Sequence, residues 1–215
     1  ALARGAGTRL DPVDVTREDI AFLQYTGGTT GVSKGAMLTH RNILANMEQT
    51  GAWLTTSFKE GTDIAIAPLP LYHIFCLTAT LSFMKWGALN VLVTNPRDLP
   101  AVLKELARWK WTIMTGVNTL FNGLLNTPGF DKLDFSSLKA VIGGGAAVQE
   151  PVAKRWQQVT GHYLTEGYGL TEASPVACAN PIGRAWNGTI GIPYPSTELS
   201  IRDEGFNELS PWTGE

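Results

Sequence analysis

The 215-residue sequence predicts an α/β fold in which a mostly parallel sheet is flanked by helices. Short apolar runs alternate along the chain with longer amphipathic segments, as they do in sheets whose strands are joined by helices. Hydrophobic residues make up 44 % of the chain, which is enough for a buried core. Glycine-rich turns follow several of the apolar runs, at the edge where such sheets bind their ligands.

Strands are expected where a short apolar run is bounded by turn residues. The expected strands cover residues 21–25, 63–67, 89–93, 112–115, 139–142, 162–166 and, in the tail, 197–202. The first of these strands leads into a loop rich in glycine and threonine. The last lies among prolines and glycines, so it is expected outside the main sheet.

Helices are expected where apolar residues recur at helical spacing. The first begins near Thr39, a suitable N-cap residue. The second is capped by Asp98 and has Pro100 in its first turn, where proline fits a helix. The third covers 117–125, and the fourth ends at Gly161. The apolar stripe of the fourth helix comprises Val148, Val152, Trp156 and Val159.

The chain is divided into three segments. Residues 1–20 lack periodicity and are interpreted as a linker, 21–188 as the α/β core, and 189–215 as the start of a following β-rich segment. The chain does not begin with methionine, and it ends abruptly after Trp212-Thr213-Gly214. Both termini therefore predict a piece of a longer protein.

The composition argues against several classes of binding partner. The formal net charge is -2, and no run of Lys or Arg indicates a nucleic acid or a polybasic membrane patch. The longest apolar stretch, 74–84, is too short to span a bilayer. Cys76 and Cys178 show neither disulfide nor metal spacing, which fits a cytoplasmic protein. Charged residues are only 17 %, so surface normally covered is expected; homodimer formation and peripheral membrane association of the whole protein stay open.

The loop from Thr26 to Gly35 holds four glycines, three threonines and one lysine. Glycine N–H groups, threonine hydroxyls and a lysine charge together can hold a polyphosphate. The candidate residues are Thr26, Gly27, Gly28, Thr29, Thr30, Gly31 and Lys34. This is not a Walker A loop, because Lys34 stands between Ser33 and Gly35. A surface turn would have a similar composition.

A second motif covers residues 166–172. Tyr168 offers a flat face for an adenine ring, Thr171 a hydroxyl near phosphate, and Glu172 a carboxylate oxygen of the kind that Mg²⁺ prefers. In the alternative interpretation, Glu172 is a solvated charge and Tyr168 a core aromatic residue.

Two further segments carry weaker signals. The glycines Gly143, Gly144 and Gly145 follow a predicted strand, and a planar base could lie against their backbone; a turn at the start of a helix explains them equally well. His73 follows a proline-rich segment, 68–72, although a lone histidine is more often structural than catalytic.

The two motifs, taken in order, resemble the signatures of the adenylate-forming superfamily, which includes acyl-CoA synthetases, luciferases and peptide-synthetase adenylation domains. The family usually has proline where this chain has Ser33. Three softer segments, 95–98, 115–121 and 134–138, resemble bacterial long-chain fatty-acid–CoA ligases.

The resemblance implies part of the large N-terminal domain of an AMP-forming ligase, with ATP and Mg²⁺ as cofactors and coenzyme A as co-substrate. It implies that Tyr168, Gly169, Thr171 and the run of glycines hold the nucleotide. Thr26 and Glu172 would bind the metal and, with Lys34, act in catalysis. The residues implied near the acid are His73, Val117 and Phe121, of which the last two are equally compatible with ordinary core.

The reaction of the family joins a carboxylate to AMP, releases pyrophosphate, and then transfers the acyl group to coenzyme A. A long-chain fatty acid is the expected substrate. The alternatives are a ligase for another acid, such as an aryl acid or one passed to a carrier protein, and a nucleotide-binding module without turnover. The ribose-binding aspartate, the hinge and the lysine of the small mobile domain lie outside this sequence, so the chain alone is expected to be inactive.

Overall fold

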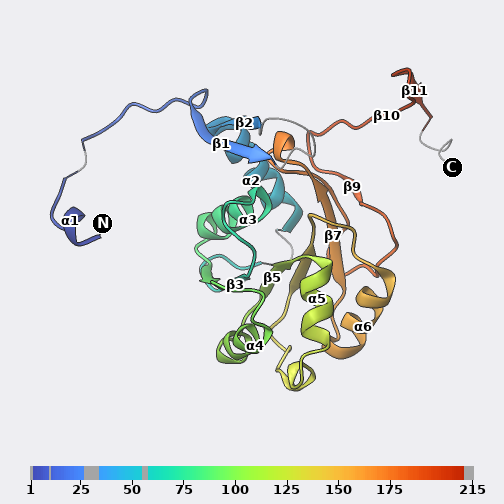
Figure 1. Ribbon diagram of the computed structural model, residues 1–215. Helices are drawn as coiled ribbons and strands as arrows, with labels where there is room; N and C mark the ends of the chain where they lie inside the picture. Colours follow the sequence, from blue (N-terminus) through green and yellow to red (C-terminus); the bar gives the residue numbers. More distant parts are fainter. Residues whose placement is uncertain (1, 10, 27–33, 55–57, 211–215) are drawn as a thin grey trace.

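A computed structural model describes residues 2–9, 11–26, 34–54 and 58–210. In this part of the chain the centre is a seven-stranded sheet in the order β4-β3-β5-β6-β7-β8-β9 (Figure 1). The strands from β4 to β7 in that order are parallel, and β8 and β9 are added antiparallel. The strands are β3 (Ile64–Ala67), β4 (Leu89–Leu92), β5 (Ile113–Gly116), β6 (Ala140–Gly143), β7 (Leu164–Gly169), β8 (Val176–Ala179) and β9 (Ile192–Pro193). The predicted α/β fold is confirmed.

Helices cover both faces of the sheet because side chains alternate along each strand. Ile66, Met114 and Val141 point into the larger core, which α4 (Leu99–Arg108), α5 (Asn118–Leu125) and α6 (Glu150–Thr160) close. Their neighbours Ala65 and Ile113 point to the opposite face, under α2 (His40–Leu54) and α3 (Ile74–Lys85). The short helices α1 (Leu2–Gly5), η1 (Phe130–Lys132) and η2 (Thr171–Ala173) lie outside these two layers.

Large aromatic side chains fix α5 and α6 to the sheet. The ring of Trp156 lies 5.1 Å from that of Phe121 and 5.3 Å from that of Phe130, centroid to centroid. All three are buried, and aromatic side chains of this size each bury about 150–250 Å².

The helix signals in the sequence are confirmed. The Asp98 side chain accepts a hydrogen bond from the Ala101 N–H, 3.1 Å away, and so caps α4. Gly161 ends α6 with a φ of 77°, a left-handed conformation that favours glycine.

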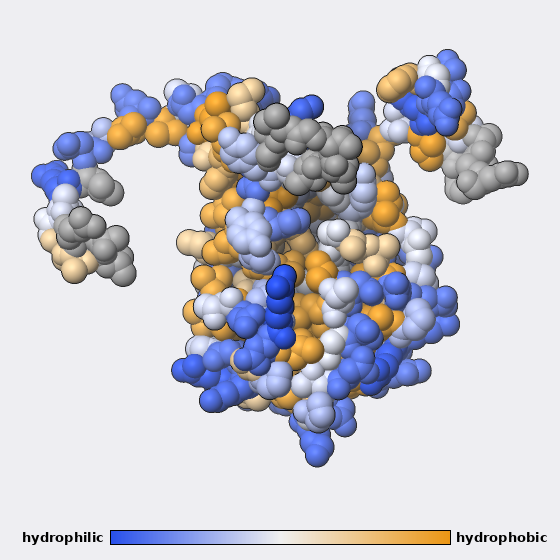
Figure 2. All heavy atoms as spheres, viewed as in Figure 1, coloured by the Kyte–Doolittle hydropathy of each residue, from blue (hydrophilic) through white to orange (hydrophobic). Residues whose placement is uncertain are grey.

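The first predicted strand exists, but its expected place in the parallel sheet was wrong. β1 (Ile20–Thr26) pairs antiparallel with β2 (Lys34–Thr39) in a separate hairpin. One face of the hairpin, with Phe22 and Leu38, packs on α2 and α3. The other face exposes Leu23 and Met37, and Figure 2 shows hydrophobic atoms in this part of the surface. Local patterning reports that a segment is extended, not which strand it pairs with.

The structure also differs from the sequence prediction in segments where apolar residues show no clear periodicity. Residues 74–85, considered above only for their length, form α3, which is apolar almost all round and so lacks an amphipathic stripe. β7 continues to Gly169, beyond the predicted end at 166. In the tail, only Ile201–Arg202 of the predicted strand 197–202 is extended; it forms β10 and pairs with β11 (Glu208–Leu209). The division into three segments stays a prediction.

Cys76 and Cys178 are both free thiols and both buried, in agreement with the absence of disulfide spacing. No helix in the described part of the chain is long and apolar enough to cross a lipid bilayer.

Candidate functional site

A cavity of about 310 Å³ opens at the carboxyl-terminal ends of β6 and β7. Its volume is at the lower end of the range for small-molecule sites. Its lining comes from the end of β1, the start of α3, the chain around the two strand ends, β8, and Tyr194 after β9. The predicted site residues among its lining are Thr26, His73, Gly143, Gly144, Gly145, Tyr168, Gly169, Thr171 and Glu172.

The run of glycines allows close packing at the cavity floor. A Cβ on Gly143 would lie 2.6 Å from Val148 Cγ2, and one on Gly144 would lie 3.2 Å from Phe75 Cε1. Gly145 turns the chain with a φ of +74°. The run therefore makes a turn ahead of α6 and leaves backbone without side chains along the cavity, and the binding of a base there stays a prediction.

The second motif begins inside β7. Tyr168 is 45 % exposed and lines the cavity, opposite Cys178 of β8 in the ladder. At Gly169 an added Cβ would lie 2.4 Å from the Pro175 carbonyl oxygen. The next N–H, of Leu170, donates to that same oxygen at 3.0 Å. Glycine is therefore required where the chain folds back toward β8.

Thr171 and Glu172 follow in η2, on the rim of the cavity. β2 lies beside η2, so the β1–β2 hairpin brings Thr26 to the same cavity. Glu172 is exposed, and its carboxylate and the Thr26 hydroxyl are hard oxygen donors. Mg²⁺ is commonly held by one or two carboxylates together with phosphate oxygens, so this donor set fits it.

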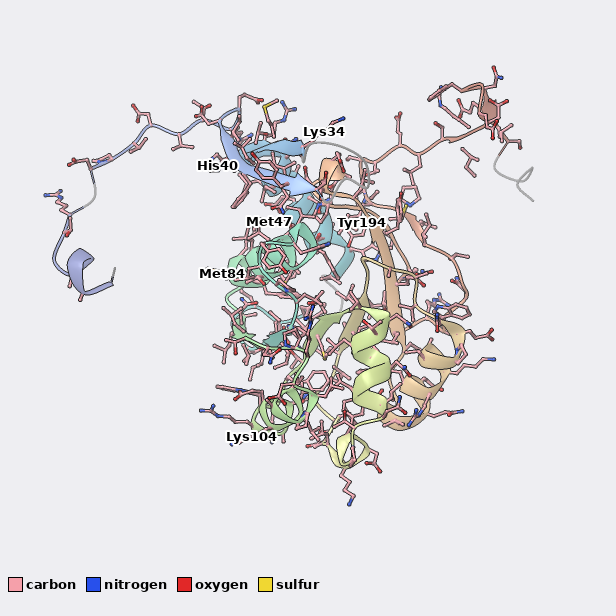
Figure 3. All side chains as sticks on the ribbon, viewed as in Figure 1. Lys34, His40, Met47, Met84, Lys104 and Tyr194 are labelled. Atoms are coloured by element: carbon pink, nitrogen blue, oxygen red, sulfur yellow. The ribbon has the colours of Figure 1, made fainter. Side chains whose placement is uncertain are left out.

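Lys34 lies directly across the hairpin from Thr26 in the strand register. Its side chain is exposed and is not among the cavity lining, and in Figure 3 it lies near the top of the hairpin. The predicted phosphate-binding residues Gly27, Gly28, Thr29, Thr30 and Gly31 lie outside the described residues.

His73 is the N-cap of α3 and lines the cavity. Its Nδ1 accepts a hydrogen bond from the Phe75 N–H over 3.3 Å. In a neutral imidazole the proton then resides on Nε2, which makes that nitrogen a donor. His73 is thus suited to donate a hydrogen bond to an anionic oxygen and poorly suited to act as a general base.

The structure does not bring Val117 and Phe121 to this cavity. Phe121 is fully buried in the core, where its ring lies under Gly116. Val117 instead lines a separate groove of about 330 Å³, with Arg97 and Leu120 among its neighbours.

Glu166, the first residue of the second motif, is buried. Its carboxylate accepts hydrogen bonds from the Val148 N–H at 3.1 Å and the Trp186 Nε1–H at 3.2 Å. It therefore joins β7 to the turn before α6 and fixes the frame in which the glycines lie.

Asn46 supports the cavity and was missed by the sequence analysis. Its buried amide donates to the Val176 carbonyl at 2.8 Å and accepts from the Val176 N–H at 3.2 Å, as a neighbouring strand would. Gln49 and Trp53 continue the same helix face and donate to the Pro195 and Asn180 carbonyls. The signal in the sequence is polar residues at helical spacing, a pattern that also occurs on solvated helix faces.

Tyr194 was also missed, because it follows a proline in an irregular segment. It is 6 % exposed, lines the cavity, and packs against Trp53 in a tilted arrangement with ring centroids 5.2 Å apart. Figure 3 shows it near α2, at the level of Met47. Burial raises the pKa of Tyr194 to about 12, although a hydrogen bond with the Thr50 side chain opposes the rise. The phenol is therefore neutral at physiological pH.

A mostly parallel α/β sheet with a cavity at its carboxyl-terminal edge, lined by glycines and an exposed tyrosine, is the arrangement found in nucleotide-binding α/β domains. Comparison with known proteins gives the family.

The family model described as "AMP-binding enzyme" matches residues 3–215. The chain is 53 % identical over 213 residues to a long-chain-fatty-acid–CoA ligase of Salmonella typhimurium, covering 98 % of this chain and 38 % of that protein. It is 41 % identical to the ligase of the same name from Bacillus subtilis, covering 94 % of this chain and 35 % of that protein. The crystal structure of ATP-bound MatB from Rhodopseudomonas palustris superposes with a TM-score of 0.83 at 28 % identity, over 97 % of this chain and 41 % of that one.

The chain belongs to the family of AMP-binding enzymes. It spans about 38 % of the length of the first of these relatives.

Proposed function

We propose that the protein containing this chain is an ATP-dependent, AMP-forming ligase that activates a long-chain fatty acid and transfers the acyl group to coenzyme A. The observation that carries the proposal is that Thr26, the glycine run 143–145 and the segment 168–172, far apart in sequence, line one cavity in a chain of this family. The identity of 53 % with a long-chain-fatty-acid–CoA ligase supports the choice of acid.

In the first step a carboxylate oxygen of the acid attacks the α-phosphorus of ATP, and the bond to the pyrophosphate leaving group breaks. The flat face of Tyr168 and the bare backbone of the glycines receive the adenine. The hydroxyl of Thr171 lies near the α-phosphate. Catalysis of this kind rests on positioning and on stabilising negative charge at the phosphoryl oxygens.

Glu172 and Thr26 would hold Mg²⁺. When bound, this ion neutralises charge on the phosphates. His73 donates from Nε2 to an oxygen of the acid or of the phosphate, because its Nδ1 is occupied by the Phe75 N–H. Lys34, on the strand opposite Thr26, adds positive charge at the open side of the site.

In the second step the thiol of coenzyme A attacks the acyl carbonyl, the thioester forms, and AMP leaves. The site residues hold the acyl adenylate and exclude water from it, because hydrolysis would waste the activated acid. The cytoplasmic location, homodimer formation and peripheral membrane association stay predictions.

The test is a substrate panel on the intact protein with ATP and Mg²⁺. Saturated fatty acids of increasing length and a set of aryl acids are compared by acid-dependent pyrophosphate release and, after coenzyme A is added, by mass spectrometry of the thioester. We expect both signals with long-chain fatty acids.

Three results would contradict the proposal. Release of pyrophosphate only with aryl acids would assign the protein to another acid class. Binding of ATP without acid-dependent pyrophosphate release would leave a nucleotide-binding module. An adenylate that forms but is not consumed by coenzyme A would point to transfer onto a carrier protein.

A further inference from the structure

A smaller cavity of about 30 Å³ lies directly behind the site cavity. The two spaces share five lining residues: Phe75, Ile142, Pro175, Val176 and Tyr194. These side chains therefore form the wall between an outer part of about 310 Å³ and an inner part about a tenth of that size.

The inner part is more than a packing defect. Two of its wall residues, Thr78 and Ser82, stand one turn apart on α3, and both are buried. Their hydroxyls have no hydrogen-bond partner among the described residues. Buried hydroxyls are normally paired, and the volume is enough for about two water molecules.

The remaining wall is largely apolar and comes from Leu54, Ala79 and Phe83. A hydrocarbon chain that entered from the outer cavity would meet this apolar surface. In the structure as it stands, the inner part is too small for more than a short stretch of such a chain. The side chains at the division therefore decide how far the chain can reach.

Tyr194 is held in place by its surroundings. Its ring packs against that of Trp53 at a tilt of 34°, and its N–H donates to the Ala177 carbonyl at 2.9 Å. The following residue, Pro195, accepts a hydrogen bond from Gln49 at 2.7 Å. Tyr194 is thus fixed from two sides and cannot swing aside cheaply.

We propose that Tyr194 is a specificity-determining residue that closes the inner cavity and sets the length of acyl chain that the site accepts. The proposal rests on the proposed function, because it takes the acid to be a fatty acid. It assigns a role to a residue outside both sequence motifs, in the segment after β9.

The test measures kcat/KM of the intact protein for a medium-chain and a long-chain fatty acid, and takes the ratio of long to medium. Tyr194→Val should raise this ratio about tenfold, the size that one or two methylene groups are worth in a hydrophobic pocket. Thr78→Leu, which fills the inner cavity from the opposite wall, should lower the ratio. Tyr194→Phe keeps the ring and should keep the wild-type ratio.

The ratio separates a change in specificity from a loss of folded protein, because a merely destabilising substitution lowers kcat/KM for both acids by the same factor. Tyr163→Val, at a tyrosine in a different groove beside α6, is the matched control and should leave activity and ratio unchanged. If Tyr194→Val does not fold, Tyr194→Leu and Thr78→Leu provide the same comparison. A folded Tyr194 variant with the wild-type ratio overturns the inference while the proposed function stands. A wild-type protein that activates no fatty acid overturns both.

Discussion

At the amino-terminal end of the parallel sheet, the Asp63 carboxylate is buried and each oxygen has a partner. Lys139 Nζ lies 2.7 Å from Oδ1, and the Lys59 N–H donates to Oδ2 over 2.9 Å. At the carboxyl-terminal end, Gly143 and its successors carry no side chains, and Glu172 lies exposed on the cavity rim. One end of the sheet is filled with paired polar groups, whereas the other is left open.

The carboxylates at the two ends of the sheet therefore have different roles. Burial raises the pKa of Asp63, but hydrogen bonds from Lys139, the Lys59 N–H and Thr112 outweigh burial and hold the pKa below its usual value. That carboxylate stabilises the fold. Glu172 forms no ion pair within the described part of the chain, so its charge is available to a ligand. Substitutions at the two ends should therefore separate stability from activity.

The largest effect is expected at Glu172. Glu172→Gln should lower kcat/KM for acid-dependent pyrophosphate release by about 100-fold or more, because the site loses the charge that holds the cation. The melting temperature should stay at the wild-type value, since the side chain is exposed. Steady-state kinetics at limiting Mg²⁺ and a thermal melt check both parts; wild-type kinetics at low Mg²⁺ would refute the metal role.

At the amino-terminal end of the sheet, a substitution should lower stability and leave activity unchanged. Asp63→Asn should lower the free energy of unfolding by about 2 kcal/mol, less than the ~3–5 kcal/mol of a fully buried pair because Lys139 is partly exposed. Activity per folded molecule should be unchanged. Urea unfolding of the variant measures the loss.

Glu150→Gln is the matched control for this experiment. It removes the exposed Lys154–Glu150 pair, whose atoms also lie 2.7 Å apart, and should cost less than about 0.5 kcal/mol. Equal losses in Asp63→Asn and Glu150→Gln would show that burial at the amino-terminal end adds nothing.

A smaller effect is expected at Tyr168. Tyr168→Ala should weaken ATP binding about tenfold, because stacking of a base on an aromatic ring is worth about 1–3 kcal/mol. Tyr168→Phe should bind as the wild type does. Calorimetric titration of ATP with Mg²⁺ checks this, with the similarly exposed Tyr163→Ala as control. An unchanged affinity of Tyr168→Ala for ATP would show that the adenine does not stack on the Tyr168 ring.

The smallest effect concerns pH. Since the folded-state pKa of Asp63 is lowered, its stabilisation is present above the usual aspartate pKa and is lost as the pH falls through the folded value. Asp63→Asn should therefore flatten the acid limb of a plot of unfolding free energy against pH, by at most about 1.4 kcal/mol per pH unit for one proton. Parallel acid limbs in variant and wild type would show that Asp63 is not the group responsible.

Helices with a clear stripe and cap were the most predictable elements. Asp98 and Gly161 bound two helices as expected, because capping depends on neighbours within a few residues. The convergence of Thr26 with Tyr168 and Glu172 on one cavity was also anticipated, because each segment follows a predicted strand, although Thr26 arrives from a separate hairpin. The roles of these residues stay predictions until the experiments above are done.

The failures have a common cause in long-range pairing. The strand before the glycine-rich loop pairs with residues 34–39 rather than with the main sheet, and hydrogen bonding between strands leaves no local trace in the sequence. Val117 caps the helix that contains Phe121, yet Val117 lines a separate groove and Phe121 lies in the core. Spacing along a helix gives the angle between two side chains, but it does not show which other part of the protein each side chain faces.

From the sequence we could infer the alternation of strands and helices, the positions of the helix caps, and the residue types able to hold a nucleotide and a cation. These depend on backbone preference and side-chain chemistry, which are properties of short segments. Only the tertiary structure decided that Asn46 replaces a strand partner for Val176, that Glu166 is structural, and that Tyr194 divides the cavity. Each of these depends on atoms brought together by packing over long stretches of chain, and one sequence does not encode that proximity in any local pattern.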